Sequence, residues 1–201
     1  MKSALLLSGG MDSLAIAYWK SPDIAFTLNY GQLAAQAEVD ASVQICNILE
    51  IEHHIINIDC SQLGSGDMAG TAKDPLAPAS DWWPYRNQLL ITLTAMKAVS
   101  LGVTNLLIGT VKSDGSHKDG TLEFVEIIDR LLACQEGGMQ IKAPAIGLST
   151  SELVKIANVP KELFAWAHSC HKSNIPCGQC RGCNKYSEVY EELGYDLDRL
   201  G

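Results

Sequence analysis

The sequence predicts an α/β fold with a parallel sheet and helices on both of its faces. Two observations support this prediction. Short apolar runs alternate with longer segments of helical periodicity, and a run of small residues joins the first apolar run to the first helical segment. Such alternation is typical of parallel strands joined by helical crossovers.

The expected strands are short runs rich in apolar residues and bounded by turn-forming or polar residues. They lie at Ala4–Leu7, Ile24–Leu28, His54–Ile58, Asn105–Ile108 and Gln140–Lys142. Between them, apolar residues recur at helical spacing. This spacing predicts helices at Ser13–Lys20, Leu33–Leu49, Asn87–Leu101 and Thr121–Cys134.

Polar turns follow four of these strands, at Ser8–Ser13, Asn29–Gln32, Asp59-Cys60 and Gly109-Thr110. In parallel sheets ligands bind beyond the carboxyl ends of the strands, so these turns should ring one crevice. The stretch Ser61–Asp81, rich in Gly, Ser, Ala and Pro, is the one long loop candidate. A loop of that length is a lid over the crevice or a mobile insertion.

Residues 1–143 are interpreted as the sheet domain, and residues 144–201 as a small C-terminal helical segment. In the second part, Ser149 and Glu152 have the spacing of a capping box, which predicts the start of a helix. Two further short helices are expected around Lys161–Ala167 and Lys185–Leu193.

The hexapeptide Ser8–Ser13, Ser-Gly-Gly-Met-Asp-Ser, joins the first strand to the first helix. Gly9 and Gly10 let a ligand approach the main chain closely. Ser8 and Ser13 add hydroxyl groups, and the free N–H groups of a helix start favour an anion. No lysine follows the glycines, so this is not a Walker loop. The hexapeptide therefore predicts a pyrophosphate-binding turn.

Four cysteines lie close together near the C-terminus, at Cys170, Cys177, Cys180 and Cys183. Thiolates at this spacing suit a tetrahedral zinc ion. An iron–sulfur cluster fits the same count, and His168 or His171 could replace one sulfur. Four protein ligands leave no open position, so the metal should be structural.

The other three cysteines stand apart. Cys46 and Cys134 continue apolar helical stripes and are expected to be small core residues. Cys60 ends a strand and enters the long loop, which makes it the one stray thiol.

The net charge of −8 disfavours nucleic acid as a partner, because domains that bind it usually carry a basic excess. No apolar run approaches the roughly 20 residues of a membrane-spanning helix. The first residues also lack a signal-peptide pattern. We therefore expect a cytoplasmic protein without a membrane partner.

The hexapeptide resembles the PP-loop of ATP pyrophosphatases, which split ATP into AMP and pyrophosphate while they activate a substrate. Together with the four cysteines, it makes the chain similar to the 7-cyano-7-deazaguanine synthases, the QueC family. Further matching pieces lie between the two ends, in the same order. They are Asn29–Gln32, Arg86-Asn87, Asp119 with Glu123-Phe124, and Ser169-Cys170 with Cys177–Cys183.

The resemblance implies a fold of the adenine nucleotide alpha hydrolase type and an ATP-dependent carbon–nitrogen ligase of queuosine biosynthesis. Such an enzyme adenylates the carboxylate of 7-carboxy-7-deazaguanine and uses ammonia to make the amide and then the nitrile, preQ0. The implied cofactors are ATP, Mg²⁺ and Zn²⁺. Ser8, Gly9, Gly10, Met11, Asp12, Ser13 and Leu14 would bind the nucleotide, and Asp12 would hold Mg²⁺.

The resemblance also implies a substrate pocket made by Tyr30, Gln32, Arg86, Asn87, Lys118 and Asp119, with Asp12, Arg86 and Asp119 in catalytic roles. Arg86 is either an anion clamp or part of a salt bridge at a helix start. Tyr30 and Trp83 either stack on a flat deazapurine or belong to the core.

The chain departs from the family pattern around this pocket. Pro84-Tyr85 replaces a usual Pro-Gly, His117–Thr121 replaces a usual Tyr-Pro-Asp-Cys-Arg, and Asn184-Lys185 replaces a usual basic residue. These departures leave two alternatives open. One is conjugation of a deazapurine acid to a protein amine in a bacterial defence system, and the other is a binding module with an idle PP-loop. A homodimer is compatible with the sequence.

Overall fold

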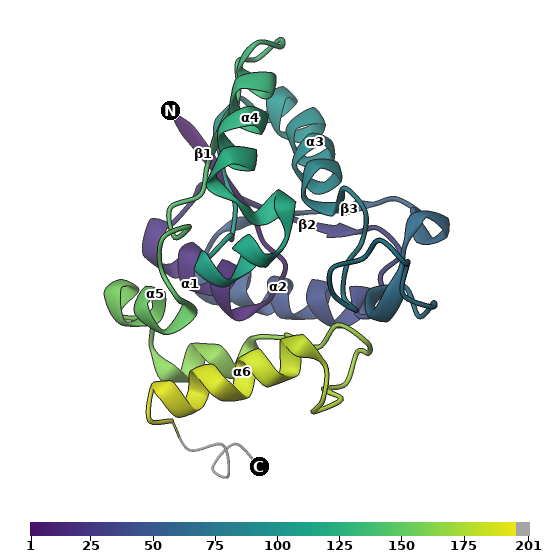
Figure 1. Ribbon diagram of the computed structural model, residues 1–201. Coiled ribbons are helices and arrows are strands. Elements are labelled where there is room, and N and C mark those ends of the chain that lie inside the picture. Colours follow the sequence, from purple (N-terminus) through teal and green to yellow (C-terminus); the bar gives the residue numbers. More distant parts are fainter. Residues whose placement is uncertain (196–201) are drawn as a thin grey trace.

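The computed structural model describes residues 1–195 and contains one five-stranded sheet in the order β3-β2-β1-β4-β5 (Figure 1). All four pairs of neighbouring strands are parallel. The strands are β1 (Lys2–Leu6), β2 (Ile24–Asn29), β3 (Glu52–Asn57), β4 (Val103–Leu107) and β5 (Gln140–Lys142). The predicted parallel sheet is confirmed.

The order of the strands reverses next to β1. From β1 the chain proceeds outward to β2 and β3, and then it returns to pair β4 with the other side of β1. A crevice opens at such a reversal, at the carboxyl ends of the two diverging strands. Ser8–Ser13 follows β1 and Gly109-Thr110 follows β4, so both turns lie at this point.

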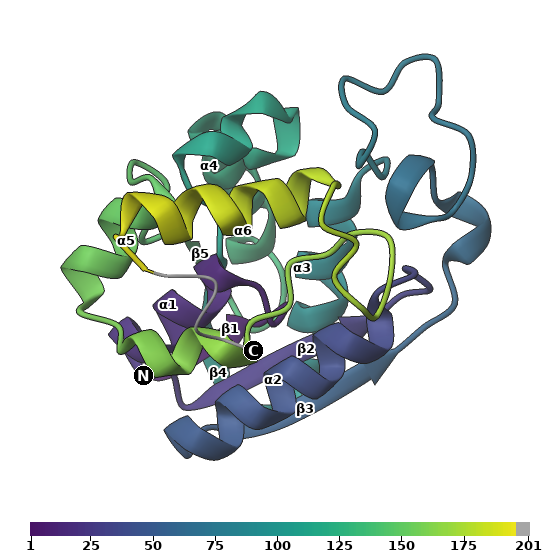
Figure 2. The ribbon, with the colours of Figure 1, turned by 90° about the horizontal axis from the view of Figure 1, so that it is seen from below.

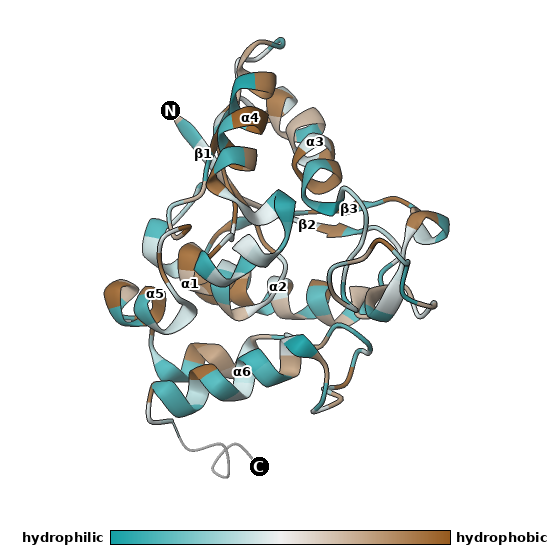
Figure 3. Ribbon diagram, viewed as in Figure 1, coloured by the Kyte–Doolittle hydropathy of each residue, from teal (hydrophilic) through white to brown (hydrophobic). Residues whose placement is uncertain are grey.

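Helices cover both faces of the sheet, as the sequence predicts (Figure 1). On one face, α1 (Met11–Lys20) and α2 (Ala35–Leu49) pack in a core that includes Leu5. On the other face, α3 (Arg86–Ala98) and α4 (Leu122–Ala133) pack in a core that includes Ala4. Neighbouring strand residues thus point to opposite faces. Each of these helices mixes apolar and polar residues, which fits one buried and one exposed side (Figure 3).

The C-terminal segment lies on the same side of the sheet as α1 (Figure 2). It contains α5 (Thr150–Ala157), a 3-10 turn (Lys161–Trp166) and α6 (Arg181–Glu192). Its buried side chains, Leu153, Phe164 and Tyr190 among them, share one core with Leu14 of α1. The domain boundary after residue 143 stays a prediction.

Two local predictions about the helices can be compared with the structure. The capping box at the start of α5 is confirmed, because Glu152 N donates to Ser149 Oγ at 3.2 Å and Ser149 N donates to Glu152 Oε2 at 2.8 Å. The predicted core position of Cys134 is wrong. The helix α4 ends at Ala133, and the thiol beyond that end is exposed.

The remaining two scattered cysteines are buried. Cys46 belongs to the core beneath α1, as predicted. Cys60 is buried too, in a small cluster with Tyr30, Met68 and Trp83. This cluster holds down the long connection between β3 and α3, which forms two 3-10 turns at Ser61–Leu63 and Gly66–Met68. Among residues 1–195, no helix has both the length and the apolar character needed to cross a membrane.

Candidate nucleotide and substrate site

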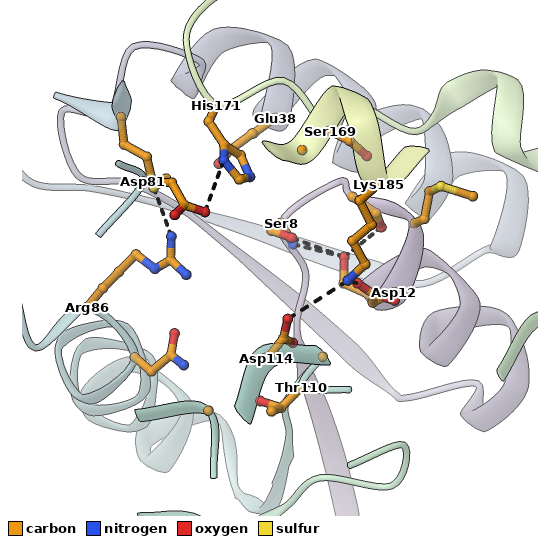
Figure 4. Close-up of a pocket in the computed structure, with 18 of the residues that line it drawn as sticks. Ser8, Asp12, Glu38, Asp81, Arg86, Thr110, Asp114, Ser169, His171 and Lys185 are labelled. Atoms are coloured by element: carbon orange, nitrogen blue, oxygen red, sulfur yellow. Dashed lines mark hydrogen bonds and ion pairs between the residues drawn. The ribbon is translucent and has the colours of Figure 1, made fainter. Parts of the chain in front are cut away.

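A cavity of about 530 Å³ opens at the reversal of strand order (Figure 4). Its walls come from the turn after β1, the start of α3, the segment after β4, the cysteine segment and the start of α6. The long loop adds Met68 and Asp81 to the wall. Segments that are far apart in the sequence therefore meet around one space.

The glycine turn is held in one conformation by its own serines. Ser8 N donates to Ser13 Oγ at 3.3 Å, and Ser13 Oγ donates to the Gly10 carbonyl at 3.0 Å. Gly9 has φ +76°, and a side chain there would meet the Glu38 carbonyl oxygen 2.8 Å from its Cβ. Gly10 precedes α1 and makes no side-chain cap, so the first N–H groups of that helix are free to bind an anion.

The structure places five of the seven predicted nucleotide-binding residues on the cavity: Ser8, Gly10, Met11, Asp12 and Ser13. Gly9 and Leu14 are not on its wall. Leu14 is fully buried in the core of α1, and Gly9 is packed against α2. These two residues shape the turn from behind.

Both carboxylate oxygens of Asp12 have partners from the C-terminal segment. Thr150 Oγ1 donates to Oδ1 at 2.6 Å, and Lys185 Nζ lies 2.7 Å from Oδ2. Lys185 Nζ also lies 3.8 Å from an oxygen of Asp114, which follows β4 (Figure 4). Burial raises the pKa of Asp114. Thr150 and Asp114 are not among the site residues predicted from the sequence.

Arg86, at the start of α3, points into the other half of the cavity (Figure 4). Its Nη1 lies 2.8 Å from the Met68 sulfur. Among residues 1–195 no carboxylate forms an ion pair with it within 4.0 Å. The predicted alternative of a salt bridge at the helix start is therefore wrong. A cation held in a cavity without an anionic partner is suited to bind an anionic ligand.

Asp119 and Asn87 hold each other at the start of α3. The Asn87 N–H donates to Asp119 Oδ2 at 3.1 Å, and Asn87 Nδ2 donates to the Asp119 carbonyl at 2.7 Å. Since the residue before the helix provides no side-chain cap, Asp119 serves as its cap from a distant loop. Both residues also lie on the cavity wall. Lys118 is exposed and is not part of that wall, which disagrees with its predicted place in the pocket.

Glu38 of α2 lines the same half of the cavity as Arg86, although it is not among the site residues predicted from the sequence. Gln32 Nε2 donates to Glu38 Oε2 at 2.8 Å, while Gln32 Oε1 accepts from the Tyr30 N–H at 2.9 Å. Gln32 is buried behind the wall and orients Glu38 from there. Burial raises the pKa of Glu38 to about 7. Glu38 lies far from the glycine turn in the sequence, so no local motif indicates that it lines the cavity.

Tyr30 and Trp83 contact each other edge to face, with ring centroids 4.9 Å apart. Both are almost fully buried. Tyr30 lies on the wall of the main cavity, whereas Trp83 does not and belongs to the cluster beneath the long loop. Of the two predicted alternatives for Trp83, the structure favours the core.

Asp81, at the end of the long loop, lines the cavity and contacts the cysteine segment (Figure 4). Its carboxylate lies 2.8 Å from Arg181 Nη1 and 3.4 Å from His171 Nδ1. His117 Nε2 lies 3.1 Å from the same Arg181 nitrogen. These contacts favour the interpretation of the long loop as a lid.

The four predicted cysteines converge, and their sulfurs lie within 4.8 Å of one another. Two sulfur pairs, Cys177–Cys183 and Cys170–Cys180, are each 3.9 Å apart. One tetrahedral ion with metal–sulfur distances of about 2.3 Å requires sulfurs about 3.8 Å apart. The donor set therefore fits a single ion. His168 and His171 point elsewhere, to the Ser173 carbonyl and to Asp81.

Comparisons with known proteins agree on one family. The family model described as "Queuosine biosynthesis protein QueC" matches residues 2–194. A protein of Methanosarcina barkeri named 7-cyano-7-deazaguanine synthase is 29% identical, and the alignment covers 100% of both chains. A protein of Chlorobaculum parvum with the same name is 30% identical, over 96% of this chain and 93% of that protein.

Two solved structures are similar in fold. The U34-tRNA thiolase NcsA from Methanococcus maripaludis, solved with its [4Fe-4S] cluster, has a TM-score of 0.53 and 20% identity. The match covers 96% of this chain and 65% of the thiolase. The NMN synthetase from Francisella tularensis has a TM-score of 0.51 and 17% identity, over 99% of this chain and 82% of the synthetase.

Proposed function

Because this chain belongs to the QueC family, we propose that it converts 7-carboxy-7-deazaguanine to preQ0 with ATP and ammonia. It is an enzyme of the ATP-dependent carbon–nitrogen ligases, similar to the 7-cyano-7-deazaguanine synthases. The observation that carries the proposal is the pairing of two anion sites in one cavity. These are the glycine turn after β1 and the guanidinium of Arg86, which has no ion-pair partner among residues 1–195.

The glycine turn would bind the phosphates of ATP through Ser8, Ser13 and the free N–H groups at the start of α1. Asp12 would hold Mg²⁺, which offsets the charge that develops on the leaving pyrophosphate. Arg86 would hold the carboxylate of the acid in its planar fork. A carboxylate oxygen then attacks the α-phosphorus, the bond to pyrophosphate breaks, and an acyl-adenylate forms.

Activation converts a poor leaving group into a good one. Ammonia attacks the acyl carbon, the bond to AMP breaks with loss of a proton, and an amide forms. A second ATP would then adenylate the amide oxygen with release of pyrophosphate, and loss of AMP and protons would give the nitrile. Asp119 and Asn87 act as positioning residues, because they fix the start of α3 from which Arg86 projects. Glu38 and Tyr30 would form the wall against the deazapurine ring, and Gln32 would orient Glu38 from behind it.

We propose zinc for the four-cysteine site and the cytoplasm as the place of action. The sulfurs are spaced for one tetrahedral ion, and four thiolates are ligands that zinc prefers. The ion would tie the start of α6 to residues 170–177. No step of the reaction is assigned to it.

A second candidate function keeps the activation step and changes the acceptor to an amine on a protein, as in a defence system. The observation that favours it is the replacement around the pocket, where His117 and Gly120 line the cavity. Because these residues differ from the usual family residues beside the activated acid, the pocket would admit a different amine.

The test is incubation with ATP, Mg²⁺ and 7-carboxy-7-deazaguanine, with and without ammonium, followed by mass spectrometry of small molecules and proteins. We expect AMP, pyrophosphate and the nitrile, with none of them from Asp12→Ala. Release of AMP without nitrile, together with a mass increase on a protein, would favour the second candidate. No pyrophosphate release above the Asp12→Ala background would contradict both.

A further inference from the structure

Lys185 extends from the first half of α6 into the phosphate half of the cavity (Figure 4). It is the one lysine on the cavity wall within residues 1–195. Its Nζ lies 2.7 Å from Asp12 Oδ2 and 3.8 Å from an oxygen of Asp114. The two arginines of the wall stand elsewhere: Arg86 lies in the other half of the cavity, and Arg181 is paired with Asp81.

The groups around the glycine turn carry more negative than positive charge, so a bound triphosphate would need a nearby cation such as Lys185. The turn itself carries no lysine or arginine, and the two carboxylates nearest to Lys185 are Asp12 and Asp114. A triphosphate brought next to two carboxylates is repelled unless cations offset the charge. Helix N–H groups supply only a partial positive charge. Mg²⁺ on Asp12 would supply one cation, and Lys185 is the protein group in place to supply another.

We propose that Lys185 binds the β- and γ-phosphates of ATP and leaves the Asp12 carboxylate to Mg²⁺ when both ligands bind. When Mg²⁺ binds the Asp12 carboxylate, the ammonium group loses its partner there. It then lies beside the bound polyphosphate, and its long stem lets it turn toward the phosphate oxygens. The inference rests on the proposed use of ATP by the glycine turn.

The cysteine site sets where this lysine stands. Lys185 lies two residues after Cys183, and Cys180 caps α6 by accepting the Cys183 N–H at its sulfur. A metal bound by both cysteines fixes the first turn of α6, and the next turn carries Lys185. The metal site thus becomes a determinant of nucleotide affinity through a residue that does not touch the metal.

The test measures binding to the metal-loaded protein by calorimetry, in the presence of Mg²⁺, with three probes: α,β-methylene-ATP, pyrophosphate and adenosine. Lys185→Met should weaken the first two by about 10- to 100-fold, the size of a lost hydrogen bond to a charged group. Adenosine binding should change less than about twofold, since adenosine carries no phosphate. Lys185→Gln, which can still donate to Asp12, should give the same pattern.

The matched control is Lys155→Met, which removes an exposed lysine from the neighbouring helix α5 and should change none of the three affinities. Thermal unfolding confirms that each variant is folded. Unchanged pyrophosphate and nucleotide binding in both Lys185 variants would overturn the proposal. An equal loss for adenosine would also overturn it, because Lys185 would then shape the pocket and not bind phosphate. No deazapurine is present, so failure of the synthase assay leaves this result unaffected.

Discussion

At the scale of the residue, a substitution of Arg86 should distinguish ligand binding in the two halves of the cavity. Its guanidinium has the Met68 sulfur as a neighbour and no carboxylate within ion-pair distance among residues 1–195. Arg86→Gln should raise the Kd for 7-carboxy-7-deazaguanine by about 10- to 100-fold, since a charge-assisted contact is lost. Binding of α,β-methylene-ATP should stay within about threefold.

Calorimetry with each ligand separately checks this expectation. Arg130→Gln, on the exposed side of α4, is the matched control and should leave both affinities unchanged. If Arg86→Gln weakened the nucleotide and spared the acid, Arg86 would be a phosphate ligand.

Glu38 makes a prediction about pH. Burial raises its pKa to about 7 in the folded protein, above the ordinary value of about 4.3. The folded state then binds more protons than the unfolded state between these values. The contribution of Glu38 to stability is full below about pH 4 and is lost as the pH rises through 7.

Glu38→Gln removes this term. Relative to wild type, the variant should gain up to about 3 kcal/mol of unfolding free energy between pH 5 and pH 8. Urea unfolding of both proteins at the two pH values measures the difference. An equal difference at both values would show that Glu38 is charged at pH 5 in the folded state.

The sequence predicted the residues whose role is local and missed those whose role depends on distant partners. Ser8 and Ser13 contact each other within one turn, so their role can be recognised from the local sequence. Lys185 acquires its role from a contact with Asp12 across 173 residues, which no local pattern contains. The family resemblance implies that Lys118 lies in the pocket, yet Lys118 opens a 3-10 turn and is exposed.

At the scale of the element, the glycine turn tests how tightly the strand-to-helix connection is built. Gly9→Ala forces an alanine to φ +76° and puts its Cβ 2.8 Å from the Glu38 carbonyl oxygen. We expect a loss of at least about 2 kcal/mol of unfolding free energy. Gly10→Ala is the control. At φ −78° with the nearest atoms at 3.6 and 3.7 Å, it should cost less than about 1 kcal/mol.

Thermal or urea unfolding measures the loss of unfolding free energy in each of the two variants. Similar losses for both would mean that the turn can rearrange around a side chain at Gly9.

Periodicity predicted every strand and the four helices of the sheet domain to within a few residues, because burial on one face repeats along each element. The exact ends depended on tertiary contacts. The start of α3 is capped by Asp119 from another segment, and Cys134 lies past the end of its apolar stripe. The exact ends of these helices depend on contacts with other segments, which the sequence of the helix itself does not contain.

At the scale of the whole molecule, the metal should govern the C-terminal segment. Structural zinc sites supply about 10–16 kcal/mol of folding free energy. We expect one zinc ion per chain, and Cys180→Ser should lose it and leave the segment after residue 168 open to proteolysis. Cys134→Ser, which removes an exposed cysteine outside the cluster, should keep the metal and the resistance.

Elemental analysis and limited proteolysis check both variants. If the protein instead contained iron and showed a visible absorption band, the zinc assignment would be wrong and the site would hold an iron–sulfur cluster.

The contacts of Asp12 have a consequence for the making of the protein. Its carboxylate is completed by Thr150 and by Lys185, which lies 173 residues later in the chain. At about 5–20 residues per second, roughly 9 to 35 seconds of synthesis separate Asp12 from Lys185. Until Lys185 has been made, the second carboxylate oxygen of Asp12 lacks its ammonium partner. The glycine turn therefore acquires both partners of Asp12 only after the segment that carries Thr150 and Lys185 has been made.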